Sequence, residues 1–363
     1  LLRQENAMWK VLGTWVDRYF GEEEAVLLAL MLVIALVVMV TFGQILAPFV
    51  AAIIFAFLLQ GGVNRLVRWR VPRLVAVALV FLLFVGIFLT ILIVVLPLIG
   101  RQAANLASEI PDMIRHWQSV LLLLPEEYPH LISESQLKEL LGQASKEVAS
   151  MAERLVSFSF STFPSLVIMM VYLVLVPLLV FFMLKDKEEL LDLLASMLPQ
   201  ERPVMWRIWH EMNLQMANYV RGKAIEILVV GLVSYVFFLF MGLQYAALLG
   251  LLVGLSVVIP YIGAMIVTFP IAAVGYFQWG FGSELLWLMV GYGIIQALDG
   301  NVLVPLLFSE AVNLHPIAII LAVLVFGGLW GFWGVFFAIP LATLVKELYN
   351  AWPRTDLPNP LSE

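Results

Sequence analysis

The sequence contains no cysteine, which excludes disulfide bonds, thiolate metal sites and catalysis by a thiol nucleophile. Charged residues are scarce, at 13% of the chain, against about 25% in soluble domains. No lysine or arginine lies between Lys223 and Lys346, and this long segment holds only four acidic residues. The net charge of −6 is spread along the chain, and no segment has the basic character of a nucleic-acid surface.

Apolar residues fill the space that charge leaves. They make up 63% of the chain, and the mean hydropathy is +1.00. Three stretches, at 25–59, 246–277 and 316–345, carry no charge at all and are interrupted near their middle by glycine or proline. A single helix over 25–59 would be about 52 Å long, well beyond a hydrocarbon core of about 30 Å. We therefore predict an all-α polytopic membrane protein in which each stretch is a broken or re-entrant hairpin of short helices.

The segments between these stretches predict the topology. An arginine cluster at Arg65, Arg68, Arg70 and Arg73 predicts a cytoplasmic loop, because inner loops are rich in basic residues. We expect one span over 74–99, ending at Pro97 and Gly100, and both chain termini on the cytoplasmic side.

Two amphipathic regions differ from the spans. Residues 101–160 repeat apolar side chains at steps of four and three, which predicts an extracytoplasmic helical hairpin that packs on itself or on a neighbouring subunit. Residues 203–223 predict an interfacial helix on the inner side, followed by a separate span over 224–241.

The expected organisation has seven parts. They are an interfacial helix at 1–24, membrane helices at 25–100, the hairpin at 101–160, a span at 161–184, cytoplasmic amphipathic helices at 185–223, a membrane core with broken helices at 224–348, and a cytoplasmic tail at 349–363.

Several strings occur together in a distinctive order and spacing. They are YVRGK at 219–223, VIPYIG at 258–263, DGNVLVP at 299–305, LHP at 314–316, GGLWGFWG at 327–334 and AIP at 338–340. In these strings the chain resembles the autoinducer-2 exporter family, which includes PerM-type permeases, and the similarity covers nearly its whole length. The resemblance implies about eight membrane helices, a homo-oligomer (a pentamer among relatives) and export of small molecules. Members are described as autoinducer-2 exporters or as sodium/proton antiporters, so the substrate stays open.

Asp299 is the main candidate for a transport site, because an acid within a membrane span is costly and marks ion or substrate pathways. With Gly300 and Asn301 it offers carboxylate and amide oxygens to a cation or a hydroxylated solute. The alternative is a helix-capping or loop residue at the inner membrane face. Pro260 and Gly263 are the second candidate: they would free backbone carbonyls at midspan, or form the tip of a helical hairpin, or both.

Three further titratable residues are weaker candidates for proton or ion coupling. Glu226 begins a span just after Arg221 and Lys223, so an ion pair within the turn is the alternative. His315 precedes a proline at a membrane boundary, where a simple hydrogen bond is the alternative. Glu310 is the third of these weaker candidates for proton or ion coupling.

Four glycines near the end of the chain, Gly327, Gly328, Gly331 and Gly334, predict either a hinge or a close-packing face of small residues.

Enzyme functions fit poorly. An intramembrane aspartyl protease needs two aspartates in separate spans, and only Asp299 qualifies. His210-Glu211 lacks the second histidine, four residues on, of a zinc protease. We therefore expect no enzyme activity, no metal and no cofactor. The expected function is that of a secondary transporter in a bacterial inner membrane, which exports a small polar molecule or exchanges a cation for protons. A passive oligomeric channel, or a scaffold that binds an envelope partner through 101–160, remains an alternative.

Overall fold

A computed structural model describes residues 23–43, 45–121, 142, 163–196, 203–260, 262–308 and 314–352. In these ranges the chain is helical and forms no strand, as the sequence predicts. Residues 1–22 of the predicted interfacial helix at 1–24, the second arm of the 101–160 hairpin apart from Gly142, and Glu310 lie outside the described residues.

The described helices are, in chain order, α2 (Glu23–Phe42), α3 (Ala47–Arg68), α4 (Arg73–Thr90), the π-helix η1 (Ile91–Val95), α5 (Leu96–Leu121), α8 (Phe163–Lys185), α9 (Lys187–Ser196), α10 (Pro203–Met241), α11 (Ala246–Ser256), α12 (Ile262–Trp279), α13 (Ser283–Leu298), the π-helix η2 (Asp299–Leu303), α14 (Val304–Phe308), α15 (Pro316–Phe336) and α16 (Ala338–Ala351).

Seven of these helical runs are long and apolar enough to cross a membrane, and two shorter apolar helices, Val171–Lys185 within α8 and α11, accompany them. Large apolar side chains remain exposed over most of their surface. A water-soluble protein would bury such faces, whereas lipid solvates them. The all-α polytopic membrane fold is therefore confirmed.

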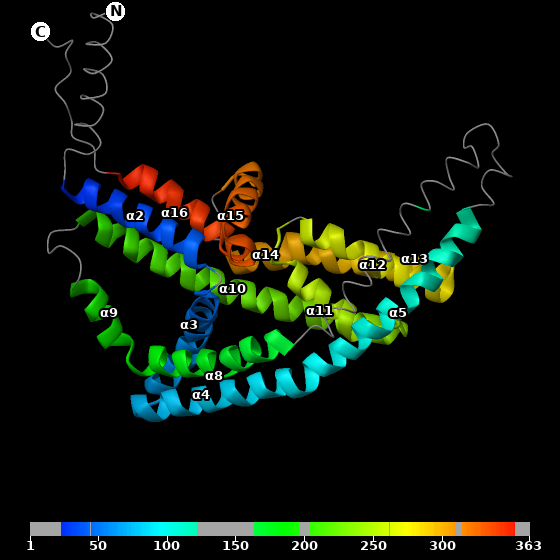
Figure 1. Ribbon diagram of the computed structural model, residues 1–363, viewed down its shortest axis with the longest axis horizontal. Coiled ribbons are helices and arrows are strands. Elements are labelled where there is room, and N and C mark those ends of the chain that lie inside the picture. Colours follow the sequence, from blue (N-terminus) through cyan, green and yellow to red (C-terminus); the bar gives the residue numbers. More distant parts are fainter. Residues whose placement is uncertain are drawn as a thin grey trace, which may run out of the picture.

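Helix α10 runs through the centre of the molecule and joins its parts (Figure 1). Its first half packs Met205 and Ile208 against Leu28 of α2 and Leu348 of α16. Its second half contributes Phe238 to the largest apolar core, which it shares with α11, α12 and α13.

The helices α3, α4 and α8 form a separate packed group, and in Figure 1 they lie on the other side of α10 from α2 and α16. Ala52, Val77 and Val180 form its buried centre, one from each helix. Arg73 at the start of α4 pairs with Glu188 in the first turn of α9. The start of α4 and the end of α8 therefore lie at the same end of this group.

The first predicted hairpin differs from the structure. The chain does break at Gly43, but α2 and α3 have 20 and 22 residues and are not short. The length of the charge-free stretch underestimates the length of α3, because this helix continues beyond residue 59 through Gly61-Gly62 to Arg68. The two helices also have different neighbours: α2 packs on α10 and α16, whereas α3 packs on α4 and α8 and, through Val50, on α10.

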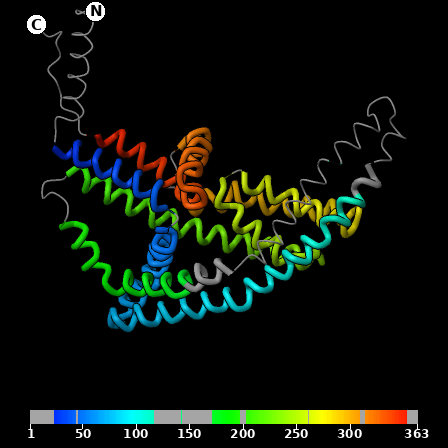
Figure 2. The backbone as a smooth tube through the Cα atoms, viewed as in Figure 1, coloured from blue at the N-terminus to red at the C-terminus, as the bar shows by residue number. Residues whose placement is uncertain are grey.

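Two other predicted helix ends are wrong. The span that begins at Arg73 does not stop at Pro97 and Gly100; helix continues through η1 and α5, and a wider π turn just before Pro97 accommodates a residue without an N–H group. The amphipathic arm of α5 then packs Met113 into the core around α11. Likewise, 203–223 and 224–241 form one helix of 39 residues (Figure 2).

The hairpin predicted at 246–277 is confirmed. Helix α11 ends at Ser256, and after a break that begins at Val257 helix α12 returns beside it, with Val253 and Ile271 in one core. Gly263 lies so close to α11 that a Cβ atom on it would be 1.8 Å from the carbonyl oxygen of Ser256. The backbones therefore touch at the tip of the hairpin.

This close approach predicts a large effect of one methyl group. Gly263→Ala should destabilise the protein by about 3 kcal/mol or more, because backbone must move to make room. Thermal unfolding of the purified protein in detergent measures it. The matched control is Gly293→Ala in α13, where a Cβ would meet nothing within 4 Å and the gain in helix propensity should offset any loss. Equal stabilities of the two variants would contradict the close contact.

Candidate functional site

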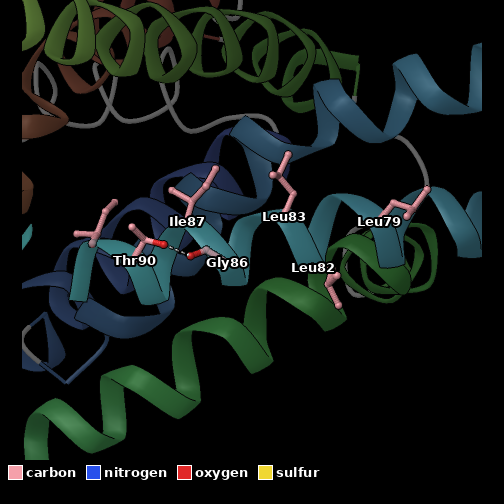
Figure 3. Close-up of a pocket in the computed structure, with 7 residues that line it drawn as sticks. Leu79, Leu82, Leu83, Gly86, Ile87 and Thr90 are labelled. Atoms are coloured by element: carbon pink, nitrogen blue, oxygen red, sulfur yellow. Dashed lines mark hydrogen bonds between the residues drawn. The ribbon is translucent and has the colours of Figure 1, made fainter. Parts of the chain in front are cut away.

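Two hollows in the described part of the chain merit comparison. One lies on the outer face of α4 and η1 and has a volume of about 550 Å³. Leucine and isoleucine side chains line it, and the hydroxyl of Thr90 in its wall donates to the carbonyl of Gly86 (Figure 3). An apolar hollow on one helix without a free polar group suits lipid, and offers no means of selecting a polar solute.

The second cavity lies inside the bundle and has a volume of about 390 Å³. Seven segments line it: α10, the break between α11 and α12, α12 itself, the end of α13 with η2, α14, α15 and α16. Its lining residues are Tyr219, Lys223, Glu226, Val257, Ile259, Pro260, Ala264, Gln296, Asp299, Gly300, Val304, Phe308, Ile319 and Ile339. This is the candidate site.

Helix α10 contributes a buried ion pair to the cavity. Tyr219, Lys223 and Glu226 are spaced by four and three residues, which places them on one face of the helix. The side chains of Lys223 and Glu226 are only 5% and 3% exposed, and Lys223 Nζ lies 2.7 Å from Glu226 Oε2. An isolated charge at this depth would be strongly unfavourable, so each group depends on the other.

The hairpin tip supplies a free backbone carbonyl. Helix α11 ends at Ser256, and Pro260 has no N–H with which to continue it. The carbonyl oxygen of Val257 accepts a hydrogen bond from Lys223 Nζ at 2.9 Å. A carbonyl that the helix break frees in a membrane needs a partner of this kind, and Lys223 thereby joins α10 to the tip.

Aromatic rings complete the surroundings of Lys223. Its Nζ lies 5.3 Å from the centre of the Phe308 ring and 6.0 Å from that of Tyr219, distances at which a ring face attracts a cation. Phe308 also packs on the backbone at Gly222, where a Cβ would be 2.7 Å from the ring. The hydroxyl of Tyr219 donates to the carbonyl of Phe336 at 2.6 Å, at the end of the second broken helix.

Asp299 reaches the cavity from inside a continuous helical run. Helix α13 passes directly into η2 at Asp299 and then into α14, so a capping or loop role for this residue is excluded. A π turn within an α-helix often marks a functional position. Asp299 Oδ1 and Gln296 Nε2 are both buried and neither has a hydrogen-bond partner among the described residues. One unpaired acceptor and one unpaired donor thus lie a single turn apart in the cavity wall.

The depth of the cavity follows from helix lengths. One end of the bundle, called the rim here, contains the end of α10 at Met241 and the starts of α11 at Ala246 and α13 at Ser283. Gln278 near the end of α12 connects to this end, because its side chain donates to the carbonyl of Gly242 and accepts from the N–H of Gln244. Counted from this rim at 1.5 Å per residue, Glu226 and Asp299 are about 22–24 Å deep and Val257 is about 16 Å deep. These lengths are shorter than a hydrocarbon core of about 30 Å, so helices that start at one membrane face would carry the polar groups inside that core.

Four of the predicted site residues come together here: Asp299, Gly300, Pro260 and Glu226 all line the cavity. Pro260 lies at the tip of the hairpin, where the carbonyl of Val257 accepts from Lys223; that the tip lies at midspan stays a prediction. Glu226 forms the predicted ion pair, with Lys223 as its partner. Their role in binding stays a prediction.

Two predicted site residues do not line the cavity. Gly263 lies directly behind the tip and serves close packing. Asn301 is exposed, and its amide donates to the carbonyl of Ala297 one turn earlier. The helix points successive residues in different directions, so an adjacent position in sequence does not share the site of Asp299.

The remaining candidates fall elsewhere. His315 caps α15, with Nδ1 accepting from the N–H of Ile317 at 3.3 Å, which is the structural alternative. Gly331 has a φ of +60° and breaks α15, four residues after the predicted Gly327. The chain folds back at this break, which brings Gly334 close to Phe326 and Gly327 close to Val335. A Cβ on Gly334 would be 1.8 Å from the carbonyl oxygen of Phe326, and one on Gly327 would be 2.8 Å from Val335. A Cβ on Gly328 would meet nothing within 4 Å.

Three polar lining residues are not among the predicted site residues: Tyr219, Lys223 and Gln296. The sequence places Tyr219 and Lys223 in the predicted interfacial helix, and only their spacing with Glu226 within one unbroken helix indicates a shared face. Gln296 precedes Asp299 by three residues, and this helical spacing is the signal that finds it.

Comparisons with known proteins identify relatives over nearly the whole chain. A family model described as AI-2E family transporter matches residues 27–354. PerM of Escherichia coli K12, a protein named as a permease, is 45% identical over 346 residues, which cover 95% of this chain and 98% of PerM. The AI-2 transport protein TqsA of the same organism is 26% identical, covering 84% of this chain and 85% of TqsA. YueF of Bacillus subtilis 168, named as a transport protein, is 27% identical, covering 83% and 84%.

The buried ion pair predicts strong coupling between its members. Lys223→Met and Glu226→Gln should each destabilise the protein by about 3–5 kcal/mol, because each leaves an uncompensated buried charge. The double variant should lose clearly less than the sum. Unfolding of the four proteins in detergent measures the coupling.

A control with the same spacing is available at the surface. Arg115 pairs with Asp112, also three residues apart, but its side chain is 73% exposed. Arg115→Met should therefore change stability by less than about 1 kcal/mol. Additive losses at Lys223 and Glu226, or a loss at Arg115 of the same size, would contradict the buried pair.

Proposed function

Because this chain belongs to the AI-2E family of membrane transporters, we propose that it is a proton-coupled secondary transporter that exports a small polar solute through the cavity at Lys223, Glu226 and Asp299. One observation carries the proposal. The tip of a broken helical hairpin and an unpaired carboxylate line the same cavity at membrane depth, an arrangement typical of secondary transporters.

The size and polarity of the cavity support a small solute. A volume of about 390 Å³ lies near the lower end of the range for ligand pockets and equals about a dozen waters. The free acceptor on Asp299 and the free donor on Gln296 are complementary to a hydroxyl group, which can donate to one and accept from the other. Autoinducer-2, which the name of the relative TqsA specifies, is a hydroxylated molecule of suitable size and is the first substrate to test.

Asp299 is the proposed proton carrier. An acid in a membrane span is a default candidate for coupling. The ammonium of Lys223 and the carboxylates of Glu226 and Asp299 together give the cavity a net charge of about −1, and protonation of Asp299 would remove this charge. The membrane-embedded surroundings support a transporter and offer nothing in favour of an enzyme or a cofactor.

A second candidate function is exchange of a cation for protons. The two carboxylates and the freed carbonyl of Val257 favour it, because these are the oxygen ligands that coordinate a coupling cation in broken-helix sites.

We extend the proposal to the surroundings of the protein. The arginines before α4 and the ion pair of Arg73 with Glu188 support a cytoplasmic position for that end, and both termini are proposed to lie there, in a bacterial inner membrane. A homo-oligomer, pentameric as the family resemblance implies, is proposed as the assembly. The apolar face of α4 is a surface that lipid or a second copy would cover (Figure 3).

Transport by purified protein in liposomes tests the function. Autoinducer-2 flux should saturate and should follow an imposed pH gradient. Asp299→Asn should lower gradient-driven flux by about tenfold or more, while exchange of labelled for unlabelled solute, which needs no net proton movement, should persist. Asn301→Ala, whose side chain lies outside the cavity, is the matched control and should transport like wild type.

The alternatives give different results. Currents that rise linearly with driving force and never saturate would indicate a passive channel. Full gradient coupling in Asp299→Asn would contradict the role of this carboxylate. No flux of autoinducer-2 or sodium, together with a stoichiometric crosslink from residues 101–160 to an envelope protein, would indicate a scaffold.

A further inference from the structure

The contacts of Lys223 resemble the coordination of a metal cation. Its Nζ touches a carboxylate oxygen of Glu226 at 2.7 Å and the hairpin-tip carbonyl of Val257 at 2.9 Å. Two aromatic rings close the remaining sides, and the side chain is only 5% exposed. A carboxylate together with a carbonyl from an unwound helix is the ligand set that holds a sodium ion in transporters with broken helices.

We propose that the ammonium group of Lys223 is a tethered cation that occupies the position of a coupling sodium ion and makes this transporter independent of sodium. The inference rests on the proposed function, in that the cavity is taken as the transport site. It also decides between the two candidate functions, because a site already filled by a covalently attached cation has no room for a free one and leaves the proton as the coupling ion.

The charge balance supports this assignment. The charged side chains that line the cavity are Lys223 and Glu226 from α10 and Asp299 from η2. With the ammonium present, Glu226 is neutralised and a single unpaired carboxylate remains. A sodium ion entering this site would be repelled by the ammonium of Lys223. It would also find the carbonyl of Val257 and the carboxylate of Glu226 already bound to that ammonium.

Removing the ammonium should convert the site. In Lys223→Met the apolar stem is kept, whereas the carbonyl of Val257 and the carboxylate of Glu226 lose their partner and Asp299 is close enough to Glu226 for the two to repel. Two uncompensated carboxylates and a free carbonyl at membrane depth then form a vacant cation site. The variant should acquire the sodium binding that the wild type lacks.

Binding of ²²Na⁺ to purified protein tests this directly and does not require transport. We expect no saturable binding to the wild type and saturable binding to Lys223→Met. In NaCl, compared with choline chloride of equal ionic strength, the Tm of Lys223→Met should rise by about 5 °C, and that of the wild type should not change. The double variant Lys223→Met/Glu226→Gln should lose the acquired binding.

Two further variants control the experiment. Arg221→Met removes the same charge two residues away on the exposed side of α10 and should behave as wild type. Lys223→Gln retains a donor for the carbonyl of Val257, and provides a second test if Lys223→Met does not fold; it should also bind sodium, more weakly.

Saturable sodium binding to the wild type would overturn the inference, and so would folded Lys223→Met and Lys223→Gln proteins that bind none. These outcomes differ from a failure of the proposed function. A wild type that transports in a sodium-driven manner would refute the tethered cation and keep the transporter, whereas a wild type without any flux would refute the transporter and leave the binding result to be judged alone.

Discussion

The structure around the cavity depends on one requirement, that a backbone carbonyl freed inside a membrane must find a donor. Helix α11 ends at Ser256, and the ammonium of Lys223 supplies the donor for the carbonyl of Val257, the next residue. That ammonium is itself stable at this depth only because Glu226 and two aromatic rings surround it. The hairpin tip, the ion pair and the long helix α10 therefore form one interdependent unit.

This unit leaves the rest of the bundle with distinct tasks. Close backbone contacts at Gly263 and Gly334 hold the two broken helices compact, and the hydroxyl of Tyr219 ties the second of them to α10. Asp299 is carried by a π turn on a separate helix, and its buried Oδ1 has no hydrogen-bond partner in the part of the chain that the structure describes. An acid that no structural partner holds is free to bind a proton or a solute.

Much of this could be predicted from the sequence, because lipid imposes simple rules. Apolar length, the scarcity of charge and the position of Pro260 predict the membrane class, the hairpin at 246–277 and the place of its break. The family resemblance is shown by a match over residues 27–354. Helix ends are predicted less well: Gly61-Gly62 and Pro97 lie inside helices whose neighbours or π turns accommodate them. The site is harder still, since whether Lys223 pairs at the surface or enters a cavity depends on α10 continuing unbroken to Met241, which tertiary packing decides.

The polar cavity should meet water inside the membrane, and the absence of cysteine from the sequence permits a direct measurement of its accessibility. Gly300→Cys places a single cysteine in the cavity wall, whereas Val302→Cys places one at an exposed position that does not line the cavity. Each variant is treated with a membrane-impermeant thiol reagent in right-side-out and in inverted vesicles. We expect the Gly300→Cys variant to react from at least one side of the membrane. The Val302→Cys variant, whose side chain should face lipid, should react from neither side. Equal reactivity of the two positions, or a cysteine at 300 that no aqueous reagent reaches, would contradict it.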